Sequence, residues 1–326
     1  MAVGRFVHGH FFRCNFMNRT KLKFIFCLTL VMMVSQLWAQ QPAEVMPLAK
    51  QSLLLSITKV GTSLVMVGER GHVLKSKDEG KSWEQISNVP VNVTLTKVVA
   101  YNNHVWAVGH DTTVIHSNDG GETWTLQFYD PDREVPLLSA YFEDENTGFV
   151  VGAYGTILST KDGGETWEDD LIHDELDYHL NDITKSKDGN YYIAAEAGYA
   201  FKSIDDGETW QEIELPYMGS MFGVAALTNE VVMYGLRGNV LISSDQGETW
   251  EELYTDIKNN LFGSTLINND ELLIVGANGT RIVYKNGDVH MMDGDDTGDD
   301  YADVISLGGQ VVMVGEAGYT VQSIKN

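Results

Sequence analysis

The stretch "SNDGGETWTLQ", Ser117–Gln127, decides the fold. The first eight residues of this stretch occur five times along the chain in slightly different form. The other copies are "SKDEGKSWEQI" (76–86), "TKDGGETWEDD" (160–170), "SIDDGETWQEI" (203–213) and "SSDQGETWEEL" (243–253). All five follow the pattern Ser/Thr-x-Asp-x-Gly-x-Ser/Thr-Trp, and successive tryptophans are 41, 43, 43 and 40 residues apart. Such regular spacing indicates a repeat architecture in which each repeat forms one supersecondary unit.

A second phrase, of the type Val-Gly-x-x-Gly, precedes each of these stretches and raises the number of repeats to seven. Its copies begin at Val67, Val108, Val151, Ala194, Tyr234, Val275 and Val314. The last two copies lack the aspartate phrase, since Asn286 and Lys325 stand where aspartate is expected. The repeat pattern therefore continues where its most recognisable part is lost.

Each repeat contains short apolar runs separated by Gly, Asn and Asp. In the second repeat the runs are "VTLTKVVA" (93–100), "HVWAVG" (104–109), "TVIHS" (113–117) and "WTLQF" (124–128). Runs rich in Val, Ile, Thr and aromatic residues predict strands, and four antiparallel strands per repeat are typical of a propeller blade. The sequence thus predicts an all-β fold, a seven-bladed β-propeller of four-stranded antiparallel blades.

The seventh repeat holds three expected strands, at 303–307, 310–315 and 319–324. Counting the spacing of the other repeats back from Ser56 places Ala43–Lys50 where a fourth strand belongs. We therefore expect the ring to be closed by this N-terminal strand joining the last blade. Pro47 is tolerable there, because the fourth strand is the outer edge of a blade. The N–H groups on the outer side of such a strand have no ladder partner, so a proline loses no hydrogen bond there.

The aspartate phrases have a structural interpretation. Each lies between the third and fourth strands, where an aspartate can accept hydrogen bonds from the backbone of its own turn and a glycine such as Gly121 can adopt a left-handed conformation. The tryptophan that follows packs its ring into the blade or its neighbour. We expect structural rather than catalytic roles for Asp78, Trp83, Asp119, Trp124, Asp162, Trp167, Asp205, Trp210, Asp245 and Trp250.

The first 39 residues have the three parts of a secretory signal peptide. A basic segment that ends at Lys23 is followed by the apolar run 24–34 and by a polar stretch with a cleavage position after Ala39. Met17 is an alternative start, and an uncleaved signal anchor is the alternative interpretation. We expect a signal peptide at 1–39 and a single propeller at 40–326.

The charge of the chain restricts its partners. It has 22 basic and 46 acidic residues, a net charge of −24, and without the leader 17 basic residues remain and the net charge is −29. Such a surface repels nucleic acid and anionic lipid headgroups. We expect a periplasmic or secreted monomer that has no transmembrane segment after signal removal and binds no nucleic acid. Its expected partner is a protein, with a membrane-associated protein as one candidate.

The repeats resemble the Asp-box (BNR or sialidase-type) superfamily. Within it, "VGAYGTILSTKDGGETW" at 151–167 is close to the repeat of the photosystem II assembly and stability factor-like family, and the resemblance covers 43–326. It implies an exported, non-enzymatic seven-bladed propeller that helps a membrane-associated protein assemble or stay stable. The photosynthetic members have an arginine-rich patch, whereas the chain after the leader has only Arg70, Arg133, Arg237 and Arg281.

The same superfamily contains the sialidases, so the alternative is a sialidase-like glycoside hydrolase or a carbohydrate-binding propeller. A sialidase has an arginine triad, a Tyr–Glu nucleophile pair and an acid/base aspartate, usually with an Arg-Ile-Pro stretch. The chain has no Arg-Ile-Pro stretch and four arginines from which to build a triad. Its acidic residues are too numerous to exclude a carboxylate pair. We expect no catalytic residues.

Partner recognition is expected on the face that holds the turns between second and third strands and the loops entering each first strand. Loops carried by a rigid frame concentrate recognition, and aromatic residues, Met and Arg anchor protein interfaces. For each residue singly, filling the centre of the ring is the alternative role. The candidates are Arg70, Asp111, Tyr154, Tyr178, His179, Tyr217, Phe222, Arg237, Phe262, Asn278 and Tyr301, with Met218 beside Tyr217.

No cofactor is expected. The stretch "DGDDTGDDYAD" (293–303) begins like a calcium loop, with Asp293, Asp295 and Asp299 as candidate ligands. Val304 stands at position twelve, where such a loop needs a glutamate. A solvated acidic loop is therefore the main interpretation.

Overall fold

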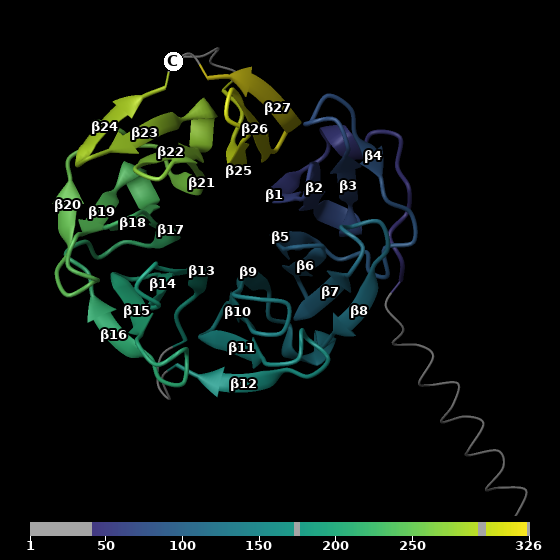
Figure 1. The fold of residues 1–326 in the computed structure, drawn as a ribbon, viewed down its shortest axis with the longest axis horizontal. Coiled ribbons are helices and arrows are strands. Elements are labelled where there is room, and N and C mark those ends of the chain that lie inside the picture. Colours follow the sequence, from purple (N-terminus) through teal and green to yellow (C-terminus); the bar gives the residue numbers. More distant parts are fainter. Residues whose placement is uncertain (1–40, 173–176, 293–297, 325–326) are drawn as a thin grey trace, which may run out of the picture. The chain divides into compact units, whose positions relative to one another are not determined.

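The computed structural model describes residues 41–172, 177–292 and 298–324, and these form seven antiparallel sheets arranged in a ring (Figure 1). The predicted leader lies outside the described residues. Six sheets have four strands and the seventh has three among the residues that the structure describes. The prediction of an all-β, seven-bladed propeller is confirmed. No helix in this part of the chain is long and apolar enough to cross a membrane.

The strands follow the repeats in order. Blade one is β1 (Leu54–Val60), β2 (Ser63–Gly68), β3 (Val73–Ser76) and β4 (Glu84–Gln85); blade two is β5 (Leu95–Tyr101), β6 (His104–Gly109), β7 (Thr113–Ser117) and β8 (Thr125–Phe128); blade three is β9 (Leu137–Phe142), β10 (Gly148–Gly152), β11 (Thr156–Thr160) and β12 (Glu168–Leu171). Blade four is β13 (Leu180–Lys185), β14 (Tyr191–Ala195), β15 (Tyr199–Ser203) and β16 (Gln211–Glu214); blade five is β17 (Met221–Ala226), β18 (Val231–Gly235), β19 (Val240–Ser243) and β20 (Glu251–Leu253). Blade six is β21 (Leu261–Asn268), β22 (Glu271–Gly276), β23 (Arg281–Lys285) and β24 (Asp288–Met291); blade seven is β25 (Tyr301–Ser306), β26 (Gln310–Gly315) and β27 (Gly318–Ser323).

The part of the chain that the structure describes also contains five short 3-10 helices: η1 (Ala49–Gln51), η2 (Glu69–Gly71), η3 (Pro131–Arg133), η4 (Leu236–Gly238) and η5 (Ala277–Gly279).

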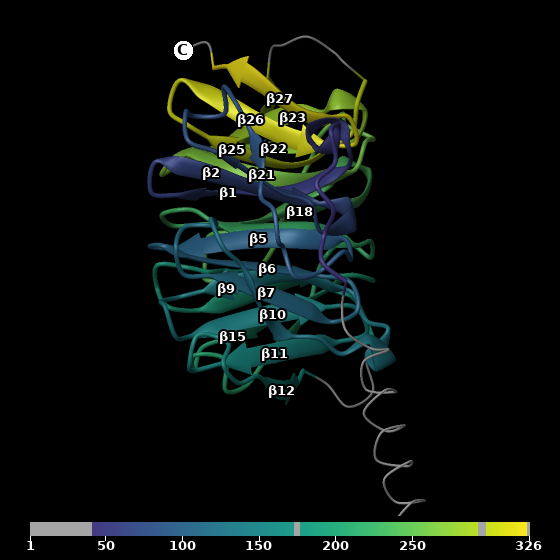
Figure 2. The same cartoon turned by 90° about the vertical axis from the view of Figure 1, so that its right-hand side faces the viewer.

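The first strand of every blade lies at the centre of the ring, and the later strands follow outward (Figure 1). Seen from the side, the strands run along the ring axis, so that their ends form two faces (Figure 2). One face carries the turns between second and third strands and is called the turn face below. The opposite face carries the aspartate phrases and is called the box face.

The core lies between neighbouring blades. Second strands such as β10 are buried at every position, since a blade covers each of their two sides. The tryptophan of a box joins this core, and Trp124 is buried in a cluster that contains Val65 of blade one and Ile115 of blade two. The boxes therefore fix how each blade packs on the one before it.

The predicted closing strand is wrong in its pairing. Ala43–Lys50 does not join β27 but follows the outer edge of blade one. The N–H group of Ala43 donates to Val89 O (2.9 Å). The side-chain amide of Gln85 accepts from the N–H group of Met46 (2.7 Å) and donates to Glu44 O (2.9 Å). These contacts use backbone groups that a ladder with β27 would require.

The same segment still covers one end of β27. A Cβ atom on Gly318 would lie 2.2 Å from Lys50 O, so that η1 sits directly against the start of the strand. Ala49 is buried in a cluster with Val312 of blade seven and Leu54 of blade one. The N-terminal segment therefore helps to close the ring by packing rather than by strand pairing.

A second closure lies at the centre of the ring, where sequence reasoning did not place one. Asp303 of β25 is 6% exposed, and its Oδ2 accepts from Ser56 Oγ (2.7 Å) and from the N–H group of Ile57 (3.3 Å). Ser56 Oγ in turn accepts from the N–H group of Val98 in blade two (3.2 Å). One aspartate thus connects the last blade to the first, and the first is connected to the second.

Candidate functional site

The turn face is built from tight turns that share one backbone feature. In six of the seven blades the fourth residue of the Val-Gly-x-x-Gly phrase has a positive φ although it is not glycine. These residues are Arg70 (φ 55°), Asp111 (55°), Tyr154 (55°), Ala197 (59°), Arg237 (58°) and Asn278 (51°). Left-handed conformations are uncommon for residues with a side chain and cost on the order of 1 kcal/mol. Six equivalent side chains are therefore presented at the tips of the turns.

In five of these six turns the next residue is glycine, which allows the chain to approach closely, whereas in blade two it is Thr112. A Cβ atom on Gly71 would lie 2.0 Å from Val91 O, and one on Gly238 would lie 2.4 Å from Ile257 O. Its N–H group is also tied to the incoming loop: Gly71 donates to Val93 O (2.7 Å) and Gly155 donates to Tyr178 O (2.8 Å). Turn and entering loop form one rigid platform as a result.

Two aromatic pairs lie on this platform, one between blades three and four and one within blade four. The ring of Tyr154 meets that of His179 edge-on, at 5.2 Å and 89°. Tyr178 stacks on Tyr199 at 4.8 Å and 17°. Tyr154, Tyr178, His179 and Tyr199 are called the aromatic cluster below. Three of them were predicted from the sequence, whereas Tyr199, at the start of β15, was not.

The remaining candidates on the turn tips lie apart from this cluster. Arg70, Arg237 and Asn278 are exposed on blades one, five and six, and Asp111 is half-buried on blade two. The N–H group of Arg237 donates to Asn260 Oδ1 (3.0 Å). The structure thus spreads these candidates around the face rather than bringing them to one point.

Three predicted aromatic residues belong to the first strands instead. Phe222 of β17 and Phe262 of β21 are half-buried neighbours, with ring centroids 5.6 Å apart. Tyr301 of β25 is 3% exposed and packs between blades six and seven, so its side chain is not available on the turn face. The repeat itself holds the signal, because Tyr301 occupies the position of the buried Leu54 and Leu95 in blades one and two.

Tyr217 lies in the loop that enters blade five. Its hydroxyl donates to Leu236 O (3.3 Å), which ties this loop to η4. Met218 beside it is 77% exposed. A Cβ atom on Gly198 would lie 3.3 Å from Met218 Sδ, so the methionine borders the turn of blade four, next to the aromatic cluster.

A belt of polar side chains surrounds the ring axis on the first strands and was not predicted. Besides Asp303, Asp182 of β13 accepts from Ser139 Oγ of blade three (2.6 Å) and from the N–H group of Val224 in blade five (3.1 Å). Lys97 lies 3.8 Å from Asp303 Oδ2. Burial lowers the pKa of Lys97, but the charges of Asp303 and Asp182 outweigh that effect and raise the pKa above its ordinary value. The belt connects blades across the centre of the ring.

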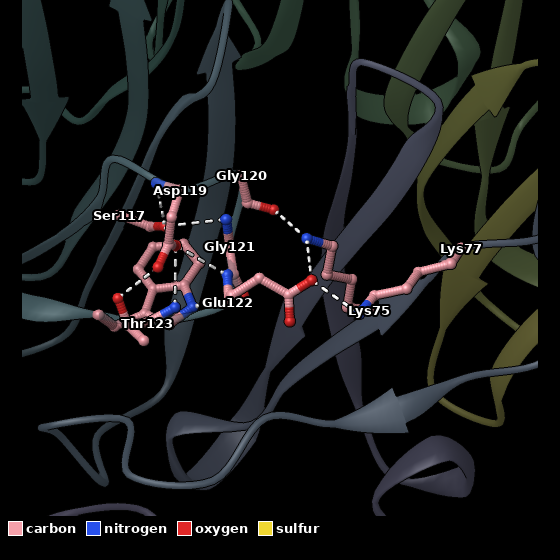
Figure 3. Close-up of polar contacts among 9 residues, drawn as sticks. Lys75, Lys77, Ser117, Asp119, Gly120, Gly121, Glu122 and Thr123 are labelled. Atoms are coloured by element: carbon pink, nitrogen blue, oxygen red, sulfur yellow. Dashed lines mark hydrogen bonds and ion pairs between the residues drawn. The ribbon is translucent and has the colours of Figure 1, made fainter.

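The box face is held by hydrogen bonds within each aspartate phrase (Figure 3). In blade two, Asp119 accepts from Ser117 Oγ (2.7 Å), the N–H group of Thr123 (2.9 Å) and Thr123 Oγ1 (2.6 Å). The N–H group of Gly121 donates to Ser117 Oγ (2.8 Å). The Asp119 carboxylate therefore accepts hydrogen bonds from its own turn, which is the arrangement of a residue that stabilises structure.

Lysines of one blade reach the box of the next (Figure 3). Lys75 of β3 is 7% exposed, and its Nζ donates to Gly120 O (2.6 Å) and Glu122 Oε1 (2.9 Å) of blade two. Lys77 also contacts Glu122 (2.8 Å). Blades three to five repeat the arrangement, with Lys161 on Glu208 (3.0 Å) and Lys202 on Glu248 (2.9 Å). This coupling escaped sequence reasoning because the two partners lie about one repeat apart.

The arginines of the described residues do not assemble a sialidase-type triad. Arg133 is held by Asp130 (2.9 Å) and by a two-point contact with Asp169. Arg281 is 5% exposed within β23 and donates to Gln322 Oε1 (2.7 Å). Arg70 and Arg237 are on the turn tips of blades one and five, so the four arginines have separate structural settings.

The described residues contain no group of three or more His, Cys, Asp or Glu side chains that could hold a metal ion. Asp293 and Asp295 of the candidate calcium loop lie outside the described residues. The carbonyl of Asp299 accepts from the N–H group of Gly279 (2.7 Å). The calcium loop therefore stays a prediction from the sequence.

The model of the family described as "Photosynthesis system II assembly factor YCF48" matches residues 32–132 and 127–229, which together span more than half of the chain. The resemblance seen in the repeats is confirmed. A curated relative, the uncharacterized protein YkuO of Bacillus subtilis (strain 168), is 31% identical over 86 residues, a match that covers 25% of this chain and 29% of YkuO.

Solved structures share the fold. "YCF48 bound to D1 peptide" has a TM-score of 0.69 and 17% identity, over 85% of this chain and 94% of that one. "YCF48 from Cyanidioschyzon merolae" has a TM-score of 0.68 and 15% identity, over 87% of this chain and 98% of that one. The extracellular domain of BT4673, a one component system of B. thetaiotaomicron described as putative, has a TM-score of 0.68 and 14% identity, over 87% of this chain and 40% of that one.

Proposed function

This chain belongs to the family of the photosynthesis system II assembly factor YCF48, and on that premise we propose that it is a non-enzymatic, protein-binding scaffold. In this proposal it is exported by its leader to the periplasm or beyond. There it acts as a monomer that helps a membrane-associated partner assemble or remain stable. A solved relative is bound to a D1 peptide, which supports a polypeptide as the kind of ligand.

The observation that carries the proposal is the construction of the turn face. Six side chains stand on left-handed turn tips, and the turns are tied to the entering loops by backbone hydrogen bonds. A preorganised surface loses little conformational entropy on binding, which favours recognition. The carboxylates of the boxes, by contrast, are occupied by their own turns.

Affinity capture from an envelope fraction tests the proposal. The double variant Arg70→Ala/Arg237→Ala should keep the melting temperature and weaken partner capture, since both side chains are exposed on turn tips. The matched control is Lys77→Ala/Lys161→Ala, which removes two exposed positive charges from the box face. Equal capture by wild type and both variants would place the interface elsewhere.

Enzyme assays test the other part of the proposal. Purified protein should give no turnover on a panel of fluorogenic sialosides and glycosides. Turnover that co-purifies with the folded propeller and is lost in a variant of a turn-face carboxylate, such as Glu196→Gln, would show that the protein is a glycosidase.

A further inference from the structure

The aromatic cluster exposes more apolar surface than folding requires. Tyr154 is 59% exposed at the tip of its turn, and Met218 nearby is 77% exposed. The equivalent turn positions in blades two and four hold Asp111 and Ala197. Aromatic rings that remain in water on a rigid surface are typical of binding sites.

The backbone of Tyr154 supports the same conclusion. Its φ of 55° is one that glycine adopts without cost and that a bulky residue seldom adopts. Glycine at this position would relieve strain and leave the turn intact, because the N–H group of Gly155 holds the loop through Tyr178 O. The fold does not need this tyrosine ring, so its role lies in what it contacts.

Among the described residues, the carboxylates of Glu196, Glu212 and Glu214 lie near the cluster. Glu196 Oε1 accepts from the N–H group of His179 (3.0 Å), and its Oε2 lies 4.0 Å from His179 Nδ1. Tyr199 pairs with Glu214 across the β15–β16 ladder. The pKa of Tyr199 is raised by neighbouring Tyr178 and also by the charges of Glu212 and Glu214. Such surroundings disfavour an anionic ligand.

We propose that the aromatic cluster binds a lysine or arginine side chain of a partner polypeptide by cation–π contact, with Glu196, Glu212 and Glu214 as the counter-charges. Aromatic faces attract cations through their quadrupole, and nearby carboxylates add a long-range attraction. The net charge of −24 favours a basic partner segment in the same way. This inference rests on the proposed function and specifies the chemistry of the segment bound.

Synthetic peptides of one common sequence provide the probe. Four versions carry Arg and Lys, Gln, Glu or Leu at the same central positions, and fluorescence anisotropy measures their binding at low and high salt. The basic version should bind, more weakly at high salt, and the other three should not. Tyr154→Phe keeps the aromatic face and should keep the affinity, whereas Tyr154→Leu should weaken it about 5- to 30-fold.

Two further variants keep the test interpretable. Tyr154→Gly should lose the peptide affinity but melt no lower than wild type, which separates binding from folding. Tyr254→Leu is the matched control, because Tyr254 is 87% exposed and its hydroxyl donates to Asp256 Oδ1 (2.6 Å). It has an acidic neighbour but lies outside the cluster, so its replacement should leave binding unchanged.

The outcomes separate this inference from the proposed function. Equal binding of the basic and Leu peptides, or equal affinity of the Tyr154→Phe and Tyr154→Leu variants, would overturn the cation–π site. Absence of binding by the basic peptide would overturn it as well. In each case partner capture that is still weakened by Arg70→Ala/Arg237→Ala would leave the scaffold proposal standing.

Discussion

Blades one to five differ from blades six and seven in how the hairpin after the third strand is stabilised. In the first group an aspartate collects hydrogen bonds from its turn, as Asp119 does, and closes the hairpin between third and fourth strands. In blade six the hairpin is a two-residue turn, with Asn286 (φ 50°) and Gly287 (φ 84°) between Lys285 and Asp288. Asn-Gly is the preferred sequence for such a turn.

Blade seven differs more strongly, because it has no fourth strand among the described residues. Its outer strand is covered at one end by η1, and its inner strand is joined to blade one by Asp303. The comparison shows that the turn-closing role of the aspartate box can be replaced from one blade to another. Ring closure, in contrast, depends on contacts that occur once.

The largest effect is expected at the contact that occurs once at the ring centre. Asp303→Ala should lower the free energy of unfolding by about 3–5 kcal/mol, since it leaves Ser56 Oγ and the Lys97 ammonium without their buried partner. Denaturant unfolding followed by tryptophan fluorescence measures it. Asp288→Ala, at an exposed carboxylate in β24, is the control and should change little. Similar stabilities of the two variants would refute the central closure.

The second effect concerns the outer closure of blade seven. Removal of residues 41–50 should cost about 2–3 kcal/mol, because it uncovers the start of β27 and apolar surface next to Ala49. Aggregation should also increase, since an uncovered strand edge recruits other chains. The control lacks the leader alone. Equal denaturation midpoints and equal light scattering would show that η1 contributes nothing to closure.

The third effect compares two left-handed glycines in equivalent hairpins. Gly121 (φ 87°) is packed, and an added Cβ atom would lie 2.9 Å from Val65 Cγ2 of blade one. Gly287 (φ 84°) has nothing within 4 Å. Gly121→Ala should therefore cost about 2–3 kcal/mol and Gly287→Ala about 1 kcal/mol. Equal costs, measured by denaturant unfolding, would mean that boxes do not position neighbouring blades.

The elements of the fold were predicted well from the sequence, because each repeat contains the turn residues and apolar runs of consecutive hydrogen-bonded hairpins. In blade two the expected runs 104–109 and 113–117 coincide with β6 and β7. The closing strand failed because spacing alone cannot tell which edge a segment will follow. The Gln85 side-chain amide holds the segment at the edge of blade one through its hydrogen bonds with Glu44 and Met46.

The site was predictable only in part. The positions of Tyr154 and Arg237 followed from the turn pattern, since every repeat directs that residue to the same face. Contacts between blades did not follow, because Tyr199 and Lys75 reach partners in other loops or in the next repeat. The sequence of a single repeat does not specify the contacts between repeats, because those contacts depend on how the ring closes.

The smallest effect is the pH dependence of a single box. Burial raises the pKa of Asp119, but hydrogen bonds from Thr123, Ser117 and the Glu122 N–H group outweigh it and lower the pKa to about 2, from an ordinary value of 3.8. A carboxyl group whose pKa is lower in the folded state stabilises the fold above its unfolded pKa. That contribution is lost as the pH falls through the folded pKa.

The melting temperatures of wild type and Asp119→Asn should therefore differ most near neutral pH and converge between about pH 4 and pH 2. Asn286→Asp is the matched control in blade six, where the pattern lacks the donors of a box, since Tyr284 and His290 stand at the positions of Ser117 and Thr123. Its carboxylate should add no comparable dependence. A constant difference for Asp119→Asn across this range would show that its charge is not what the turn binds.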